Sequence, residues 1–291
     1  MMNHPLFRPP AEAESLILQV DRGCPYNRCS FCGMYKDIRF RRLSLKEIQP
    51  LLDEEIPHFP EARRVFLADG DVMQRPFDEL AEILRMLGER LPALARVNVY
   101  AAGTGILDKS QEQLRALRAL KLQTLYLGLE SGSDEVLKQM RKAESAEQMV
   151  EAGCRAQAAG LRMSVMVLLG LGGQERSAAH ADETAQALNA MQPRLLSALR
   201  VIPVAGTALG RDAEEGRFSQ VSEHGAVEEL RRLTAGLQLE NTVFRANHVS
   251  NVVPVEGRLP RDKARILDEL DRLLTTGRLD RRSPGPVPLW L

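Results

Sequence analysis

Short apolar runs alternate with longer amphipathic segments along the first two hundred residues. The apolar runs are rich in β-branched residues and predict strands near 15–20, 64–69, 96–102, 124–131, 162–169 and 197–204. Hydrophobic positions at helical spacing predict helices near 45–56, 76–90, 111–120, 133–141, 146–159 and 175–191. This repeated strand–helix order is typical of parallel strands joined by crossover helices. Periodicity alone fits both a doubly wound sheet and an incomplete barrel.

Three helix ends carry local signals. Ser44 and Glu47 have the three-residue spacing of a capping box, and so do Ser145 and Gln148. Gly160 follows a predicted helix at the position where a left-handed cap is expected.

The pattern changes beyond residue 205. A polar, turn-rich stretch comes first, and two further helices are predicted near 223–240 and 261–276. Between them, polar residues interrupt an apolar run at 247–254, which either contacts a substrate or connects neighbouring elements. The last residues, RRSPGPVPLWL, contain three prolines and are expected to run over the surface.

Composition narrows the class of protein. The chain has 291 residues, of which 44% are hydrophobic and 27% charged, enough to build a sizeable core. Lys and Arg number 39, as do Asp and Glu, so no overall field attracts nucleic acid or anionic lipid. Acidic residues surround the basic clusters at 39–42, 63–64 and 278–282, and a nucleic-acid partner is not expected. No membrane span or signal core is evident, so we expect a cytoplasmic protein.

Three of the four cysteines lie on one short loop directly after the first predicted strand. In a reducing compartment, such a cluster indicates metal binding or catalysis. Cys24, Cys29 and Cys32 suit a 4Fe-4S cluster with one iron left open for an external ligand. A zinc ion with a distant histidine as fourth ligand is the alternative, although zinc loops more often show paired cysteines. Cys154 lies in a predicted helix, where we expect it to pack as a small apolar residue.

The loop sequence GCPYNRCSFC resembles the cluster loop of radical S-adenosylmethionine (radical SAM) enzymes. That family usually spaces its cysteines by three and then two residues, with an aromatic residue before the last. Phe31 matches the aromatic, whereas the first spacer here has four residues, giving CxxxxCxxC. The resemblance implies that the three cysteines bind a 4Fe-4S cluster and that S-adenosyl-L-methionine (SAM) binds its open iron.

Four later segments, each at the end of a predicted strand, resemble further parts of the same family in the same order. The turn at 69–71 looks like the glycine-rich acidic turn that holds the SAM amino group. The stretch at 127–142 is similar to the one that leads to a basic residue on the SAM carboxylate. The segments at 167–174 and 201–207 resemble those beside the adenine and at the end of the sixth strand. The implied SAM contacts are Phe31, Asp69, Gly70, Asp71, Glu130, Ser131, Arg141, Lys142, Leu168 and Ile202.

Five of these contacts have a plainer interpretation. Asp69 and Asp71 also suit caps of the following helix, and Glu130 suits a buried ion pair. Arg141 and Lys142 suit a solvated helix end.

Two positions depart from the family pattern. The third strand, 97–102, lacks a carboxylate that many relatives carry, and Met166 stands where several place an aspartate. Ribose or carboxylate contacts are then expected to move to Glu130, Arg162 or Arg200.

The resemblance covers residues 15–207 and implies an α/β fold, a partial (β/α)6 TIM-type barrel of parallel strands with a C-terminal helical extension. The expected organisation is an N-terminal extension at 1–14, a core at 15–207 and an extension at 208–291 that closes the barrel. Active sites of such barrels gather at the carboxyl ends of the strands, where all these segments fall.

The resemblance implies a radical SAM enzyme that generates a 5′-deoxyadenosyl radical to abstract hydrogen from a small-molecule substrate. A one-electron reductant such as flavodoxin or ferredoxin is the implied partner. Modification of RNA or a peptide is the alternative within the family. A zinc-stabilised nucleotide-binding barrel and an iron–sulfur electron carrier are alternatives from other classes.

Overall fold

The chain folds around one mostly parallel sheet, as a computed structural model that describes residues 7–281 shows. The strand order is β1-β4-β5-β6-β7-β8-β9-β10. These strands are β1 (Leu16–Gln19), β4 (Arg64–Ala68), β5 (Arg96–Ala101), β6 (Leu122–Glu130), β7 (Arg162–Leu169), β8 (Leu195–Arg200), β9 (Thr242–Ala246) and β10 (Val255–Leu259). A separate ribbon pairs β2 (Asp21–Arg22) with β3 (Arg41–Arg42).

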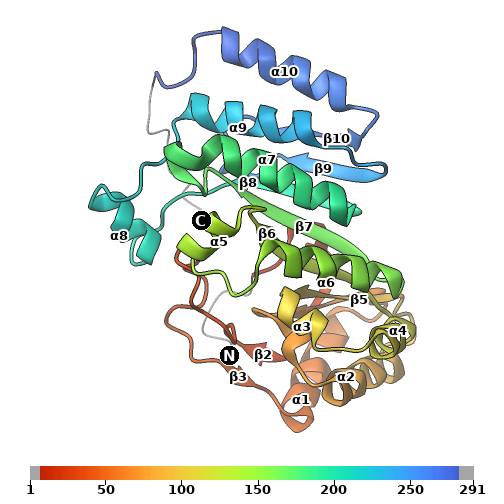
Figure 1. Cartoon of the computed structure of the whole chain (residues 1–291). Helices are drawn as coiled ribbons and strands as arrows, with labels where there is room; N and C mark the ends of the chain where they lie inside the picture. Colours follow the sequence, from red (N-terminus) through yellow and green to blue (C-terminus); the bar gives the residue numbers. More distant parts are fainter. Residues whose placement is uncertain (1–6, 282–291) are drawn as a thin grey trace. The chain divides into compact units, whose positions relative to one another are not determined.

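Helices connect successive strands, as crossover connections require (Figure 1). The α-helices are α1 (Leu45–Glu55), α2 (Phe77–Arg90), α3 (Gly103–Leu107), α4 (Gln111–Ala119), α5 (Asp134–Gln139), α6 (Ala146–Ala158), α7 (Gly173–Met191), α8 (Ala208–Glu214), α9 (Glu223–Gly236) and α10 (Lys263–Thr275). Short 3-10 turns occur at Pro10–Glu12, Ile56–His58 and Val72–Gln74.

The chain divides into two compact units. The first contains the described chain up to Asn27 together with Met34–Leu127 and Ala152–Met163. The second contains Arg28–Gly33, Gly128–Glu151 and the described chain from Ser164 onward. The cysteine loop therefore starts in the first unit and continues in the second.

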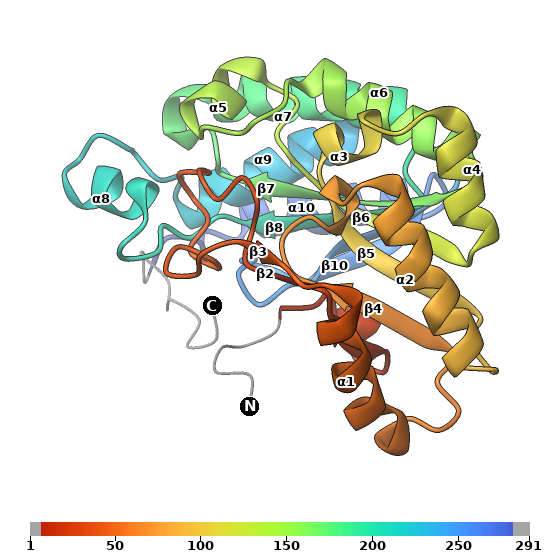
Figure 2. The same cartoon turned by 90° about the horizontal axis from the view of Figure 1, so that it is seen from below.

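In the first unit, β1, β4, β5 and the start of β6 pair in parallel. Helices α1, α2 and α4 lie along one face of these strands (Figure 2), where alternate strand residues are fully buried. On the other face the rings of Phe66, Tyr100 and Tyr126 meet edge to face. Glu12, from the N-terminal 3-10 turn, accepts hydrogen bonds there from Tyr126 Oη at 2.5 Å and Asn98 Nδ2 at 2.8 Å.

In the second unit, β7, β8 and β9 are parallel, and β10 returns antiparallel to β9. Helix α9 packs against α7 on one side and α10 on the other (Figure 1). The predicted strands and crossover helices are thus confirmed, and the sheet is that of a parallel barrel-type α/β fold.

The C-terminal region differs from its prediction because it is not only helical. β9 and β10 extend the sheet, and segment 247–254 is the loop that joins them. These strands have five residues each, β9 follows α9 closely and β10 lies just before α10, and Gly257 weakens the strand signal of β10. α8 lies within the stretch predicted to be turn-rich. Thr207 caps it by accepting a hydrogen bond from Gly210 N at 2.9 Å. The last ten residues lie outside the described range.

The predicted helix ends are confirmed. Ser44 N donates to Glu47 Oε2 at 2.9 Å before α1. Gln148 N donates to Ser145 Oγ at 3.2 Å, and Ser145 N donates to Gln148 Oε1 at 2.9 Å before α6. Gly160 has a φ of 84°, the left-handed conformation expected of a glycine cap.

Candidate active site

The strand that leads into the cysteine loop is held by a buried arginine. Arg75 is 3% exposed and donates through Nη2 to Val20 O at 2.5 Å, Asp21 Oδ1 at 2.8 Å and Leu43 O at 2.7 Å. One planar guanidinium thereby fixes the chain on either side of the loop. The sequence signal for this role is weak, because Arg75 lies more than fifty residues from Val20 and in no motif.

The turn after β4 lies directly against the first cysteine. Gly70 N donates to Gly23 O at 3.1 Å. A Cβ at Gly70 would lie 2.5 Å from Cys24 Cβ and 3.0 Å from its Sγ, so only glycine allows this approach. The glycine turn and Cys24 are therefore in direct contact within the first unit.

The two aspartates beside Gly70 bind backbone and side-chain donors of the same unit. Asp69 Oδ2 accepts from Gln19 Nε2 at 2.7 Å and from Gly23 N at 3.3 Å. Asp71 Oδ1 accepts from Ala102 N at 3.1 Å, which ties the turn to the end of β5. Asp71 makes no side-chain cap to the 3-10 turn that follows it, so the helix-cap alternative is wrong for this residue.

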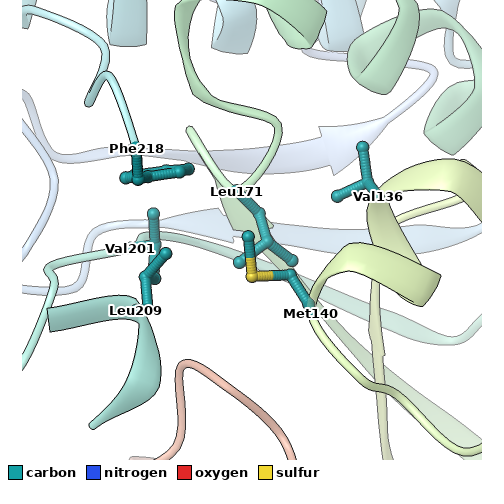
Figure 3. Packing of buried hydrophobic residues seen from close by; sticks show 6 residues of the cluster. All are labelled: Val136, Met140, Leu171, Val201, Leu209 and Phe218. Carbon is teal, nitrogen blue, oxygen red and sulfur yellow. The ribbon is translucent and has the colours of Figure 1, made fainter. Parts of the chain in front are cut away.

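The second half of the cysteine loop is anchored within the second unit. Ser30 N donates to Met140 O at the end of α5, and Leu209 N in α8 donates to Ser30 O, both at 2.9 Å. Phe31 packs against an apolar cluster formed by Val136, Met140, Leu171, Val201, Leu209 and Phe218 (Figure 3). Cys29 and Cys32 flank these anchors, and Cys32 N donates to Cys29 O at 3.4 Å. None of the three loop cysteines forms a disulfide, and each is half-buried.

The end of β6 carries a buried ion pair. Lys142 Nζ lies 3.5 Å from Glu130 Oε1, with both side chains about nine-tenths buried. A Cβ at Gly128 would lie 2.1 Å from that same Oε1, so Gly128 leaves the room in which the carboxylate folds back. The ion-pair alternative for Glu130 is thus what the structure shows.

Burial and charge act together on this pair. Burial raises the pKa of Glu130, and the nearby Lys142 ammonium opposes that rise. Burial by itself would lower the pKa of Lys142, but the charges of Glu130, the Cys29 thiol and Glu144 raise it above its ordinary value. Lys142 is therefore held protonated beside Cys29.

Arg141 and Lys142 differ although they are neighbours. Arg141 is exposed and has a φ of 53°, while the side chain of Lys142 is only 12% exposed. Lys142 N donates to Leu137 O at 2.9 Å, which closes the end of α5. The solvated-helix-end interpretation fits Arg141 and does not fit Lys142.

Ser131 and Leu168 meet the same histidine. Ser131 Oγ lies 2.7 Å from His180 Nδ1, and His180 Nε2 lies 3.1 Å from Leu168 O. No motif marked His180, which is 2% exposed on α7. Ile202 is half-buried two residues beyond the end of β8.

Two expectations from the sequence are wrong. Cys154 is exposed on α6 and does not pack as a buried residue. Arg162 is the first residue of β7 and is exposed at the amino end of that strand, away from the carboxyl ends. Arg200, at the end of β8, lines a small cavity with Ala226 and Leu230 of α9, and its contact with SAM stays a prediction.

Within residues 7–281, no group of three or more His, Cys, Asp or Glu side chains is placed to hold a metal ion.

Comparison with protein families decides the identity of the core. The sequence model of the Radical SAM superfamily matches residues 18–184, more than half of the chain. The chain belongs to the radical SAM superfamily. Members of this superfamily are enzymes that use a 4Fe-4S cluster and SAM and need an electron donor.

Similar radical SAM proteins have diverse names. The chain is 24% identical over 178 residues to a Methanocaldococcus jannaschii protein provisionally named a methylthiotransferase, covering 56% of this chain and 38% of that protein. It is 26% identical over 168 residues to 4′-phospho-dehydrooxetanocin synthase of Priestia megaterium, covering 52% of this chain and 23% of that protein. The match thus spans well under half of either relative.

Solved radical SAM structures share the fold. Coproporphyrinogen III oxidase (HemN) from Escherichia coli superposes with a TM-score of 0.59 at 18% identity, over 76% of this chain and 51% of that one. Methylornithine synthase (PylB) superposes with a TM-score of 0.53 at 18% identity, over 89% and 81%. The predicted radical SAM fold is confirmed. No helix in the described part of the chain has the length and hydrophobicity that crossing a bilayer requires.

Proposed function

We propose that this chain is a radical SAM enzyme that acts on a small molecule. Cys24, Cys29 and Cys32 bind three irons of a 4Fe-4S cluster and leave the fourth iron to SAM. In the first unit, SAM contacts come from Asp69, Gly70 and Asp71. In the second unit they come from Phe31, Glu130, Ser131, Arg141, Lys142, Leu168 and Ile202.

The residues around the cysteines suit such a cluster. Gly70 has no side chain that would push against Cys24, as the distances to its Cβ and Sγ require. Lys142 places a buried positive charge near Cys29, which suits the negative charge of a cluster bound by cysteine sulfurs. Ser30, between Cys29 and Cys32, is anchored by two backbone hydrogen bonds, to Met140 O and from Leu209 N.

The chain's own groups bind and orient the nucleoside. A 4Fe-4S cluster held by Cys24, Cys29 and Cys32 would supply one electron for the reductive cleavage of SAM, and through it radical hydrogen abstraction from the substrate. Lys142 pairs with the SAM carboxylate, and Glu130 holds the lysine in place. The backbone at Gly70 approaches the amino group closely, and the apolar side chains of Phe31 and Leu168 exclude water around the nucleoside.

One observation carries this proposal. Gly70, from a turn forty-six residues further along the chain, is packed against Cys24 so closely that no other residue fits. Both residues were expected from separate motifs of the same family. Their contact in the first unit supports one cofactor site shared by the cysteine loop and the glycine turn.

The proposed substrate is a small molecule, and the proposed electron donor is a flavodoxin or ferredoxin. The balance of 39 basic and 39 acidic residues offers no field for RNA. Modification of RNA or a peptide is the alternative, because similar proteins carry the names of several different reactions. We also propose that residues 15–207 form the catalytic core, after an N-terminal extension at 1–14, and that 208–291 close it.

Anaerobic reconstitution with iron and sulfide tests the proposal. The full chain is expected to turn brown and to release 5′-deoxyadenosine when given SAM and dithionite. Cys29→Ala is expected to lose the cluster and the product, because two thiolates do not hold it. Cys154→Ala is the matched control and is expected to keep both, since Cys154 is exposed on α6.

Two results would contradict the proposal. One is a colourless protein that holds a single zinc ion after reconstitution. The other is equal loss of the cluster in Cys29→Ala and Cys154→Ala.

A further inference from the structure

A buried histidine links the ends of two neighbouring strands in the second unit. His180 Nε2 lies 3.1 Å from Leu168 O, and a carbonyl only accepts, so Nε2 carries the proton. Burial lowers the pKa of His180 to about 4, so the ring is neutral near pH 7 and Nδ1 accepts. Ser131 Oγ therefore donates to Nδ1 at 2.7 Å and accepts from Ser133 N at 3.0 Å. One imidazole joins the turn after β6 to the end of β7.

A buried carboxyl holds the next residues of β7. Glu229 on α9 is 2% exposed, and its Oε1 accepts from Gly170 N at 2.5 Å. Its Oε2 accepts from Ser177 Oγ, and its Oε1 lies 3.5 Å from His180 Nε2. Gly170 has a φ of 78° and lies one residue beyond the end of β7, where the pairing with β8 stops. Glu229 thus satisfies the donor at a turn that strand pairing leaves open.

The other charged groups of these helices face solvent. Asp182 of α7 pairs with Arg232 of α9, and Arg231 of α9 pairs with Asp271 of α10, all at exposed positions. His180 is therefore the titratable group that faces Glu229 from α7, and β7 presents only backbone.

We propose that His180 and Glu229 are positioning residues that hold the turns after β6 and β7 in the conformation that binds SAM. This inference rests on the proposed function, because Ser131 and Leu168 are the SAM contacts that the two residues fix. Neither His180 nor Glu229 touches the ligand. His180 acts through Ser131 Oγ and Leu168 O, which belong to proposed SAM contacts. Glu229 acts through the amide of Gly170, two residues beyond Leu168.

The effect expected from their loss follows from buried hydrogen bonds. Removing the acceptor leaves the Gly170 amide buried and unpaired, and the turn is expected to move until water reaches it. Glutamine at position 229 keeps an acceptor for Gly170 and an amide for Ser177. It should therefore restore the wild-type turn, whereas leucine should not.

The test measures the dissociation constant of SAM by equilibrium dialysis on the reconstituted full chain. Glu229→Leu and His180→Leu are expected to weaken SAM binding about tenfold with unchanged iron content. Glu229→Gln is expected to stay within about twofold of wild type. The matched control is Thr234→Val, also fully buried on α9, whose hydroxyl bonds only Leu230 O at 2.7 Å. It should lower stability without changing SAM affinity.

Several outcomes would overturn the inference. Wild-type SAM affinity in folded Glu229→Leu and His180→Leu would do so, as would equal weakening in Thr234→Val. If Glu229→Leu does not fold, Ser177→Ala removes only one bond to the carboxyl and is expected to weaken SAM binding about threefold. Unchanged affinity there would also refute it. A wild-type chain that binds the cluster but no SAM would refute the proposed function itself.

Discussion

Three of the residues predicted to contact SAM have an unusual backbone conformation that fixes where their side chains lie. Asp69, Glu130 and Arg141 have φ values of 80°, 62° and 53°, in the left-handed region that L residues seldom adopt. Each of the three is itself a predicted SAM contact. Such strain persists where surrounding contacts fix it, as the hydrogen bonds of Asp69 and the ion pair of Glu130 do here.

Gly70 gives the sharpest prediction at this scale. Gly70→Ala is expected to abolish most cluster binding, because the new methyl group would lie 2.6 Å from the Cα of Cys24, which cannot swing away like a side-chain tip. Iron content after anaerobic reconstitution is the measurement.

Gly88→Ala is the matched control for Gly70→Ala. Gly88 lies in α2, and a methyl group there meets no atom within 4 Å. Alanine is the better helix former, so this variant is expected to keep its iron and to gain about 1 kcal/mol in the free energy of unfolding. Equal iron content in the two variants would contradict the close approach.

At the scale of the element, the end of α5 decides which basic residue faces inward. The helix stops at Gln139, and the left-handed Arg141 turns the chain so that Lys142 N reaches back to Leu137 O. Arg141 thereby stays in solvent while Lys142 reaches Glu130. Glycine is the usual residue at this position of a helix end because it adopts the conformation without strain.

Arg141→Gly separates a conformational role from a direct contact. If the backbone turn is what matters, the glycine variant keeps wild-type SAM affinity and is no less stable. Arg141→Val, which resists the left-handed conformation, is expected to lose about 1–2 kcal/mol in the free energy of unfolding and to weaken SAM binding. Urea denaturation and SAM dialysis measure the two effects. A large loss of SAM affinity in Arg141→Gly is the result expected if the guanidinium makes the direct SAM contact proposed above.

At the scale of the whole molecule, Glu229 and His180 set opposite pH dependences of stability. Burial raises the pKa of Glu229 from 4.5 to about 7, so its contribution is present below pH 4.5 and is lost as pH rises through 7. Burial lowers the pKa of His180 from 6.5 to about 4, so its contribution is present above pH 6.5 and is lost as pH falls through 4. Between pH 4.5 and 6.5 the two groups together hold about one proton in both the folded and the unfolded chain. Their opposite effects on the pH dependence of stability therefore nearly cancel in this range.

Single variants should separate these two slopes. The reference is the double variant that carries both Glu229→Gln and His180→Gln. Relative to it, Glu229→Gln alone is expected to lose about 2 kcal/mol in the free energy of unfolding as pH falls from 7.5 to 5. His180→Gln is expected to lose about as much as pH rises over the same range. Urea denaturation at several pH values measures both. Parallel slopes in the two variants would show that the groups do not titrate as their burial requires.

Local patterns in the sequence determined the strand–helix core and the cysteine loop. Helical and strand periodicity, capping boxes and cysteine spacing all act over a few residues, so the chain displays them directly. The order of motifs along the strands also indicated Gly70, Glu130 and Lys142, because parallel strands bring their carboxyl ends to one edge.

Only the tertiary structure decided what supports those residues. Arg75 reaches Val20 across 55 residues, His180 reaches Ser131 across 49, and Glu229 reaches Gly170 across 59. A hydrogen bond over such a separation depends on how strands are ordered and which helix covers them, and no local pattern records that. The same reason explains β9 and β10, whose pairing at the end of the sheet compensates for their short, weak strand signals. It also explains Cys154, whose exposure depends on which face of α6 the rest of the fold covers.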